Sequence, residues 1–197
     1  MNRFAALLEA LLLTPSRNGK LRLMQEYFRS QPDPERGWAL AALTGELSFA
    51  EAKPHQIRTL AAAQVDPELL DWSYDFVGDL AETVSLIWPV PATGPGDIAV
   101  PSLSEIVEIL RRAGRAEVAR LVAPWLDALD ATGRWALLKL VTGSLRIGVS
   151  ARLAKSALAE ASGVGLDRIE EVWHSLSPPY RPLFDWLEGR GPAPELR

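Results

Sequence analysis

The chain has 197 residues, of which 48% are hydrophobic and 23% are charged, enough apolar material for one folded domain or two small ones. Its formal net charge of -4 argues against a generic polyanion-binding tail but leaves room for a local basic surface. The absence of cysteine excludes a disulfide framework, a zinc ribbon and a thiol nucleophile, and no apolar run approaches the roughly 18 residues of a membrane span. We expect a cytoplasmic protein with no membrane segment.

Apolar residues recur at intervals of three and four along most of the chain, while β-branched residues are scattered. This periodicity predicts helices throughout, and we expect the helix that contains Pro124 to be kinked or broken there. The sequence therefore predicts an all-α fold of about twelve helices. In chain order, the expected helices cover residues 2–13, 20–30, 34–43, 54–63, 67–74, 78–88, 103–113, 115–129, 133–141, 151–161, 168–174 and 180–188.

Four of these helix starts carry capping signals. An aspartate before a proline at the first helical position supplies an acceptor for the free amides of the first turn, and a serine three residues before a glutamate has the spacing of a capping box. The four signals are Asp33-Pro34, Asp66-Pro67, Ser102 with Glu105, and a looser version in Asp167 with Glu170.

A connector rich in proline and glycine, residues 89–101, separates the helices into two halves at about 1–88 and 102–188. We expect both halves to belong to one helical domain over residues 1–188. The tail at 189–197 is again rich in proline and glycine and is expected to begin a linker to a further domain.

The two halves resemble one another. A shift of 98 residues, without a gap, places Thr44 and Gly45 on Thr142 and Gly143. We infer a duplication, which predicts two equivalent loops at helix junctions, related by an approximate twofold axis.

The common catalytic and cofactor motifs are absent from the sequence. There is no Walker A motif, no dinucleotide fingerprint and no spacing typical of a zinc or EF-hand site. His55 and His174 are interpreted as ordinary helix residues, and the two glycines of residues 162–167 as a helix stop followed by an aspartate cap. The tryptophans are spread along the chain, which indicates core filling rather than a platform for stacked bases: Trp38, Trp72, Trp88, Trp125, Trp135, Trp173 and Trp186.

The stretch LKLVTGSLRIGVS, residues 138–150, places two glycines and an arginine at the junction of two expected helices. Glycines let backbone amides approach an anion closely, the first amides of the following helix point toward it, and Arg146 can hold a phosphate in bidentate fashion. The stretch lies in a window without Asp or Glu, residues 131–159, that contains Arg134, Lys139, Arg146, Arg152 and Lys155. A second acid-free stretch, residues 10–25, contains Arg17, Lys20 and Arg22.

Three segments resemble the N-terminal DNA-binding domain of bacterial ATP-dependent DNA ligases: LVTGSLRIGVS at 140–150, TPSRNGKLRLMQEYF at 14–28 and SYDFVGDLAET at 73–83. The resemblance spans nearly the whole chain. It implies an all-helical domain of two pseudo-twofold-related halves that straddles the minor groove of nicked duplex DNA and binds phosphates through paired helix-junction loops. It also implies a role in DNA repair, replication or recombination.

Carried over position by position, the resemblance implies that the second loop supplies the main contacts to backbone phosphates. The first loop has Glu46 and Phe49 where the second has Ser144 and Ile147, and it has no arginine, so we expect a weaker grip there. The implied contacts are Thr142, Gly143, Ser144, Arg146 and Gly148 in the second loop, Thr44 and Gly45 in the first, and Arg17, Lys20, Arg152 and Lys155 as supporting cations.

In the resembled family, the nucleophilic lysine lies in a Lys-x-Asp-Gly motif of a separate adenylation domain, and an OB-fold domain completes the clamp. None of the four lysines of this chain is followed by that pattern. We therefore expect no catalytic residue and no cofactor in this chain, and no nick sealing by it alone. ATP and magnesium are implied only for a full-length ligase.

Two alternatives stay open. The chain could be an α-helical repeat scaffold that binds a protein partner, with the basic window as a solvated surface. It could also be an enzyme of its own, in which Asp75, Asp79 and Glu82 hold a magnesium ion, although such acids more often form a solvated helix start.

Overall fold

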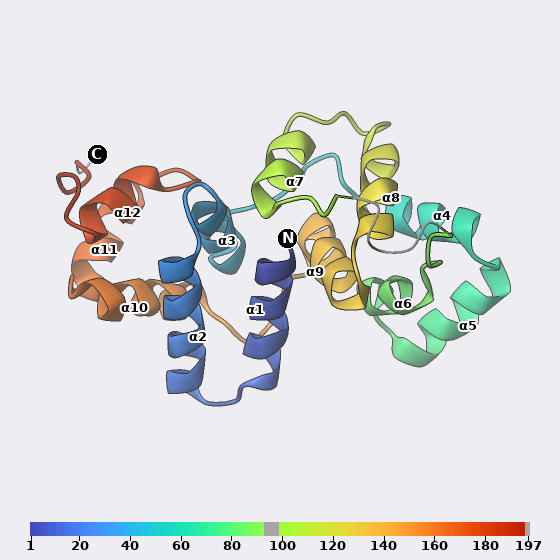
Figure 1. Cartoon of the computed structure of the whole chain (residues 1–197), viewed down its shortest axis with the longest axis horizontal. Coiled ribbons are helices and arrows are strands. Elements are labelled where there is room, and N and C mark those ends of the chain that lie inside the picture. The colour runs from blue at the N-terminus through green and yellow to red at the C-terminus, as the bar shows by residue number, and fades with distance from the viewer. Residues whose placement is uncertain (93–98, 196–197) are drawn as a thin grey trace. The chain divides into compact units, whose positions relative to one another are not determined.

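The computed structural model describes residues 1–92 and 99–195 of the chain (Figure 1). Within these ranges the chain forms twelve α-helices and no strand, which confirms the predicted all-α fold. No helix in the described ranges is both long and apolar enough to cross a membrane. The helices are α1 (Asn2–Leu13), α2 (Arg17–Ser30), α3 (Glu35–Leu43), α4 (Pro54–Gln64), α5 (Pro67–Val77), α6 (Leu80–Ile87), α7 (Leu103–Leu110), α8 (Val118–Ala128), α9 (Ala131–Thr142), α10 (Ala151–Ser162), α11 (Leu166–Trp173) and α12 (Arg181–Leu187).

Residues 89–92 and 99–101 of the expected connector contain no helix, and its residues 93–98 lie outside the described residues. Helix α8 continues through Pro124 without a break. The predicted start at Gly78 is wrong: this glycine ends α5 with a left-handed φ of 76°, and Asp79 then caps α6.

Two of the four capping signals are confirmed. The Asp66 carboxylate accepts hydrogen bonds from the amides of Glu68 and Leu69 at 2.8 and 3.1 Å. Ser102 and Glu105 form a reciprocal capping box, with distances of 3.0 and 2.7 Å.

The other two signals are wrong. No side chain caps α3, because the Asp33 carboxylate instead binds the guanidinium of Arg36. Helix α11 begins one residue before Asp167, with Gly165 in the capping position, so this aspartate lies inside the first turn.

The helix order repeats with the predicted shift of 98 residues. Helices α1 to α6 correspond in order to α7 to α12, and each shifted helix end lies within three residues of its counterpart. For example, α4 ends at Gln64 and α10 ends 98 residues later, at Ser162. The agreement of all six pairs supports the inferred duplication.

The chain divides into two compact units, each described here by itself. Unit 1 comprises Met1–Ala6 and Ser48–Leu145, and unit 2 comprises Leu7–Leu47 and Arg146–Arg197. In unit 1, α6 packs on α9 and α5, and α4 packs on α8. In unit 2, α10 packs on α2, α3 and α11. Each unit thus combines helices from both halves of the sequence, and the packing of α4 on α8 in one has its repeat-related counterpart in the packing of α10 on α2 in the other.

Each unit has its own apolar core. In unit 1 the fully buried side chains include Val84, Leu103, Ile106, Leu126 and Leu137. In unit 2 they include Met24, Leu40, Ala154, Ile169 and Leu183. Burial of each large apolar side chain among them contributes about 1.5–3 kcal/mol to the stability of its unit.

Unit 2 also contains a buried guanidinium. Arg36 on α3 donates to the Asp33 carboxylate at 2.9 Å and to the carbonyl of Phe28 at 3.2 Å, and it forms an ion pair with Glu188. Burial alone would lower the pKa of Arg36, but the two carboxylates outweigh it and raise the pKa above its ordinary value. The arginine therefore stays charged and joins the start of α3 to the end of α12.

Gly37 on α3 lies where another backbone approaches the helix closely. A Cβ atom at this position would lie 1.7 Å from the carbonyl oxygen of Pro179. We expect Gly37→Ala to lower the free energy of unfolding by about 1–3 kcal/mol through overpacking, although alanine is the better helix former. Urea unfolding followed by circular dichroism measures the change. Gly114→Ala is the control, because its nearest neighbour would lie 3.5 Å away; equal midpoints for wild type and Gly37→Ala would contradict the prediction.

Candidate nucleic-acid interface

The helix end of the second loop is a Schellman motif. Gly143 adopts a left-handed φ of 69° after the last residue of α9. Its amide donates to the carbonyl of Leu140 at 3.3 Å, and the amide of Ser144 donates to the carbonyl of Lys139 at 3.1 Å. The hydroxyl of Thr142 donates to the carbonyl of Leu138 at 2.7 Å.

The first loop has the same Schellman motif and the same threonine bond. Gly45 has a φ of 77°, and its amide donates to Ala42 at 3.3 Å. The amide of Glu46 donates to Ala41 at 2.9 Å, and the Thr44 hydroxyl donates to Leu40 at 2.9 Å. In these three bonds, each donor and acceptor of the first loop lies 98 residues before its counterpart in the second, so the repeat extends from helix order to individual hydrogen bonds.

These bonds correct one expectation about the loops. The amides of Gly143 and Ser144 were expected to face an anion, but both donate to carbonyls of α9. The exposed surface of Gly143 nevertheless stays open, because a Cβ atom there would have no neighbour within 4 Å. Whether Thr142, Gly143 and Ser144 contact a phosphate stays a prediction, which now depends on close approach and on the two hydroxyls, 2.8 Å apart.

The segment that follows, residues 146–150, belongs to unit 2 and is attached to α2. Ile147 is buried, and Gly148 adopts a left-handed φ of 68°. The ammonium group of Lys20 on α2 donates to the carbonyl of Gly148 at 2.7 Å. The left-handed backbone conformation favours glycine here, and a Cβ atom, which would lie 2.8 Å from this ammonium group, would also make the end of the lysine side chain shift.

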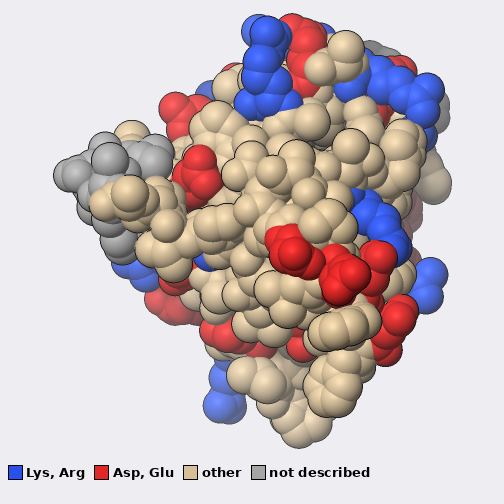
Figure 2. Space-filling model, turned by 90° about the vertical axis from the view of Figure 1, so that its right-hand side faces the viewer, with Lys and Arg blue, Asp and Glu red and all other residues tan. Residues whose placement is uncertain are grey.

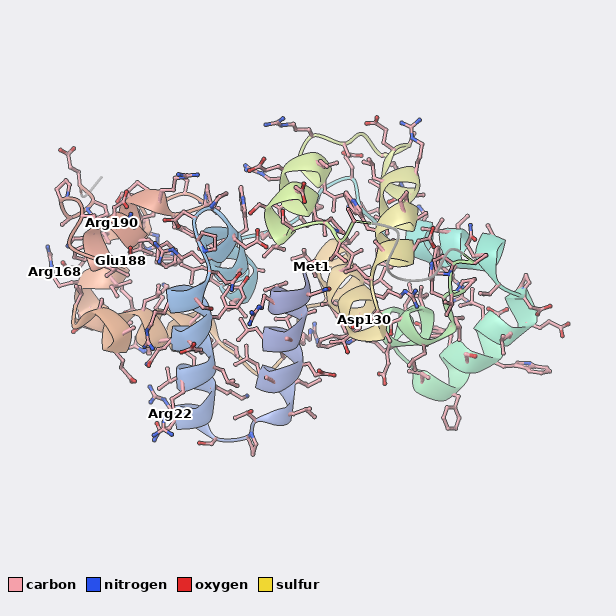
Figure 3. The ribbon with its side chains drawn as sticks, in the orientation of Figure 1. Met1, Arg22, Asp130, Arg168, Glu188 and Arg190 are labelled. Atoms are coloured by element: carbon pink, nitrogen blue, oxygen red, sulfur yellow. The ribbon has the colours of Figure 1, made fainter. Side chains whose placement is uncertain are left out.

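Four exposed arginines of unit 2 have no ion-pair partner among the described residues: Arg17, Arg22, Arg146 and, at the start of α12, Arg181. Arg146 is exposed next to the buried Ile147, and Arg17 is exposed in the first turn of α2. Arg22 extends from α2 into solvent (Figure 3). Sequence reasoning placed Arg22 in an acid-free stretch but left it out of the predicted contacts, although its lack of nearby acids was the available signal.

The two supporting cations on α10 have partners within unit 2. Arg152 lies 3.3 Å from the Glu170 carboxylate, while 67% of its side chain remains exposed. The Lys155 ammonium group lies 4.5 Å from the centre of the Trp173 ring. The indole nitrogen of Trp173 in turn donates to the Glu46 carboxylate at 2.9 Å, so the glutamate that distinguishes the first loop has a structural role.

Two of the five cations in the 131–159 window do not belong to a basic surface. Arg134 is buried and donates to the carbonyl of Leu126 at 2.7 Å. Lys139 in unit 1 forms an ion pair with Asp79 at 2.5 Å. The window is therefore less basic on its outside than its composition suggests. Of its remaining cations, Arg146 and Lys155 have no ion-pair partner among the described residues, and both belong to unit 2.

Asp79 is an ion-pair partner and a helix cap. Besides binding Lys139, its carboxylate accepts from the amide of Glu82 at 2.8 Å. No group of three His, Asp or Glu side chains that could hold a metal ion occurs among the described residues. Burial tends to raise the pKa of Asp79, but Lys139 and the backbone amides outweigh it and hold the pKa below its usual value of 3.8.

We expect Asp79→Asn to lower the free energy of unfolding at pH 7 by about 1 kcal/mol, with a smaller difference at low pH. Because the folded-state pKa is depressed, the charged carboxylate stabilises the fold above pH 3.8, and this contribution is lost as the pH falls through the folded-state pKa. Urea unfolding of wild type and Asp79→Asn at pH 7 and near pH 3 measures this difference in the free energy of unfolding. Asp71→Asn, at the exposed pair with Arg58, is the control; a difference for Asp79→Asn that does not change with pH would contradict the assignment.

The chain is similar to a protein described as a DNA ligase. A probable DNA ligase from Opitutus terrae is 25% identical to the chain over 215 residues, an alignment that covers 86% of this chain and 21% of the relative. The chain thus spans about a fifth of the length of that protein. No protein-family model matches the chain.

Proposed function

We propose that the chain binds nicked duplex DNA through backbone phosphates, without reading sequence, as the DNA-binding part of an ATP-dependent DNA ligase. The observation that carries the proposal is the exposed Arg146 beside a glycine turn that Lys20 attaches to α2, together with the exposed Arg17 and Arg22 on the same helix as Lys20. None of the three arginines has an ion-pair partner among the described residues. The weak similarity to a probable DNA ligase over 86% of the chain supports the same reading.

The chemistry of these side chains suits phosphates. A guanidinium group binds two phosphate oxygens at once, and it stays charged at every physiological pH. Contacts to the sugar-phosphate backbone fix the position of a protein on a duplex but carry no sequence information. We assign the direct contacts to Arg146, Arg17 and Arg22, with the exposed Arg152 in support and Lys20 holding the turn.

The proposed role in ligation is indirect. The sequence has no Lys-x-Asp-Gly motif, so the adenylation chemistry, with its ATP and magnesium, would belong to another domain of the ligase. Binding the nick here would raise its local concentration at a tethered active site. The adenylation and OB-fold domains are the proposed partners, and repair, replication or recombination the proposed setting.

Salt-dependent binding tests the proposal. We expect this chain to bind a dye-labelled nicked duplex at low salt, with an affinity that falls steeply and linearly on a log–log plot as salt rises, because each neutralised phosphate releases counterions. Fluorescence anisotropy measures it on two duplexes of unrelated sequence and on their intact versions. No detectable binding at low salt would reject the proposal and favour a protein-binding scaffold.

We expect Arg146→Ala to weaken DNA binding about tenfold at low salt and to lower the salt slope by about one, equally on unrelated sequences. The matched control is Arg168→Ala, which removes an exposed arginine of α11 that is already paired with Glu171. The same anisotropy titrations measure both variants. An unchanged salt slope for Arg146→Ala, or an equal loss for both variants, would remove Arg146 from the contacts.

A further inference from the structure

Besides the face that packs inside unit 1, helix α5 carries an apolar surface that faces solvent. Phe76 is 91% exposed, Trp72 is 71% exposed and Leu69 is 50% exposed. The tryptophans were predicted to fill the core. Trp38 is buried as predicted, but the prediction is wrong for Trp72. Exposed aromatic residues grouped on one surface mark an interaction site more often than scattered ones do.

Helical geometry separates α5 into three faces. Because an α-helix turns by about 100° per residue, Leu69, Trp72 and Phe76 fall within about 60° of one another. The buried Leu70 lies on a different face, which packs inside unit 1. The apolar stripe is thus additional to the face that α5 needs for folding.

The stripe adjoins a groove between α5 and α6. Leu86 on α6 is 64% exposed, and it lines the groove together with Trp72, Phe76 and Ile87. The groove has a volume of about 310 Å³, at the lower limit of roughly 300–1,000 Å³ for ligand pockets. Its size and apolar lining suit protruding side chains of a docked segment.

The third face of α5 is acidic. Glu68, Asp71 and Asp75 each lie one position before a residue of the apolar stripe. The acidic row therefore lies about 100° from the stripe around the helix. Asp71 pairs with Arg58, while the exposed carboxylates of Glu68 and Asp75 have no partner in the described part of the chain. In Figure 2, where the side that carries α5 faces the viewer, uncharged residues cover a broad area and Asp and Glu gather beside them.

We propose that this surface, formed by Leu69, Trp72, Phe76 and Leu86, docks an amphipathic helix of a partner protein that carries a row of Lys or Arg beside its apolar stripe. The apolar stripe and groove supply the contact area, and the acidic row selects the charge of the partner. A second copy of the chain fits less well, because a twofold contact through this surface would bring like charges together. The acidic row also disfavours DNA and anionic membranes.

A synthetic helical peptide tests the proposal. The probe is a dye-labelled peptide of about fifteen residues with leucines along one stripe and lysines along the adjoining one, and the control peptide has glutamates in place of the lysines. We expect this chain to bind the lysine peptide at least tenfold more tightly than the glutamate peptide, measured by fluorescence anisotropy. Amide chemical-shift changes should map to α5 and α6.

Substitutions at exposed positions should leave the fold intact. We expect Phe76→Ser to weaken binding of the lysine peptide at least tenfold, because exposed aromatic residues supply much of the affinity of such contacts. The matched control is Leu13→Ser, at a leucine of unit 2 that is 75% exposed, and it should bind like wild type. The double variant Glu68→Lys with Asp75→Lys reverses the charge at both positions, and it should bind the glutamate peptide more tightly than the lysine peptide.

Several outcomes would overturn the proposal: no binding of the lysine peptide, equal binding of both peptides, or shift changes confined to other helices. A concentration-dependent dimer in sedimentation that Phe76→Ser abolishes would assign the surface to a second copy instead. Binding of nicked DNA by Phe76→Ser should match wild type, so this proposal and the proposed function stand or fail separately.

Discussion

The proposed DNA-binding surface of unit 2 depends on how α10 is held against α2. The hydrogen bond from Lys20 to the carbonyl of Gly148, with Ile147 buried beside it, fixes the turn that precedes α10. Gly148 has a left-handed φ of 68°, a conformation that glycine adopts without strain. Because the turn is anchored on its inner side, Arg146 is left exposed on the outer side. Lys20 thus contributes its charge mainly to the fold, and the arginines contribute theirs to the surface.

The two helix ends share the hydrogen bonds of the repeat but differ in the residues that flank them. Both loops keep the same Schellman bonds and the same threonine bond, since these satisfy carbonyls that any helix leaves without a partner. The residues beyond those bonds are free to diverge. In the first loop, Glu46 binds the indole of Trp173, while in the second the exposed Arg146 has no ion-pair partner in the described part of the chain. The backbone motif is therefore structural, and the difference in charge is what separates the two loops.

The two proposed binding surfaces lie on different units. The arginines proposed to contact DNA, Arg17, Arg22 and Arg146, belong to unit 2, whereas unit 1 carries the exposed aromatic stripe and its acidic neighbours on α5. A surface that binds a polyanion and one that selects a basic partner repel each other's ligands, so placing them on separate units lets both coexist in one acidic chain.

The sequence by itself determined the helices, their repeat and two of the four capping signals, because periodicity and capping are set by residues a few positions apart. It could not determine which charges stay free. Arg36 pairs with Glu188, 152 residues later, and Lys139 leaves the basic surface because Asp79, sixty residues earlier, pairs with it. The stripe on α5 likewise became an exposed surface only when α6 covered one face of the helix and not the other. Burial and ion pairing join residues distant in the chain, and only the tertiary structure brings them together.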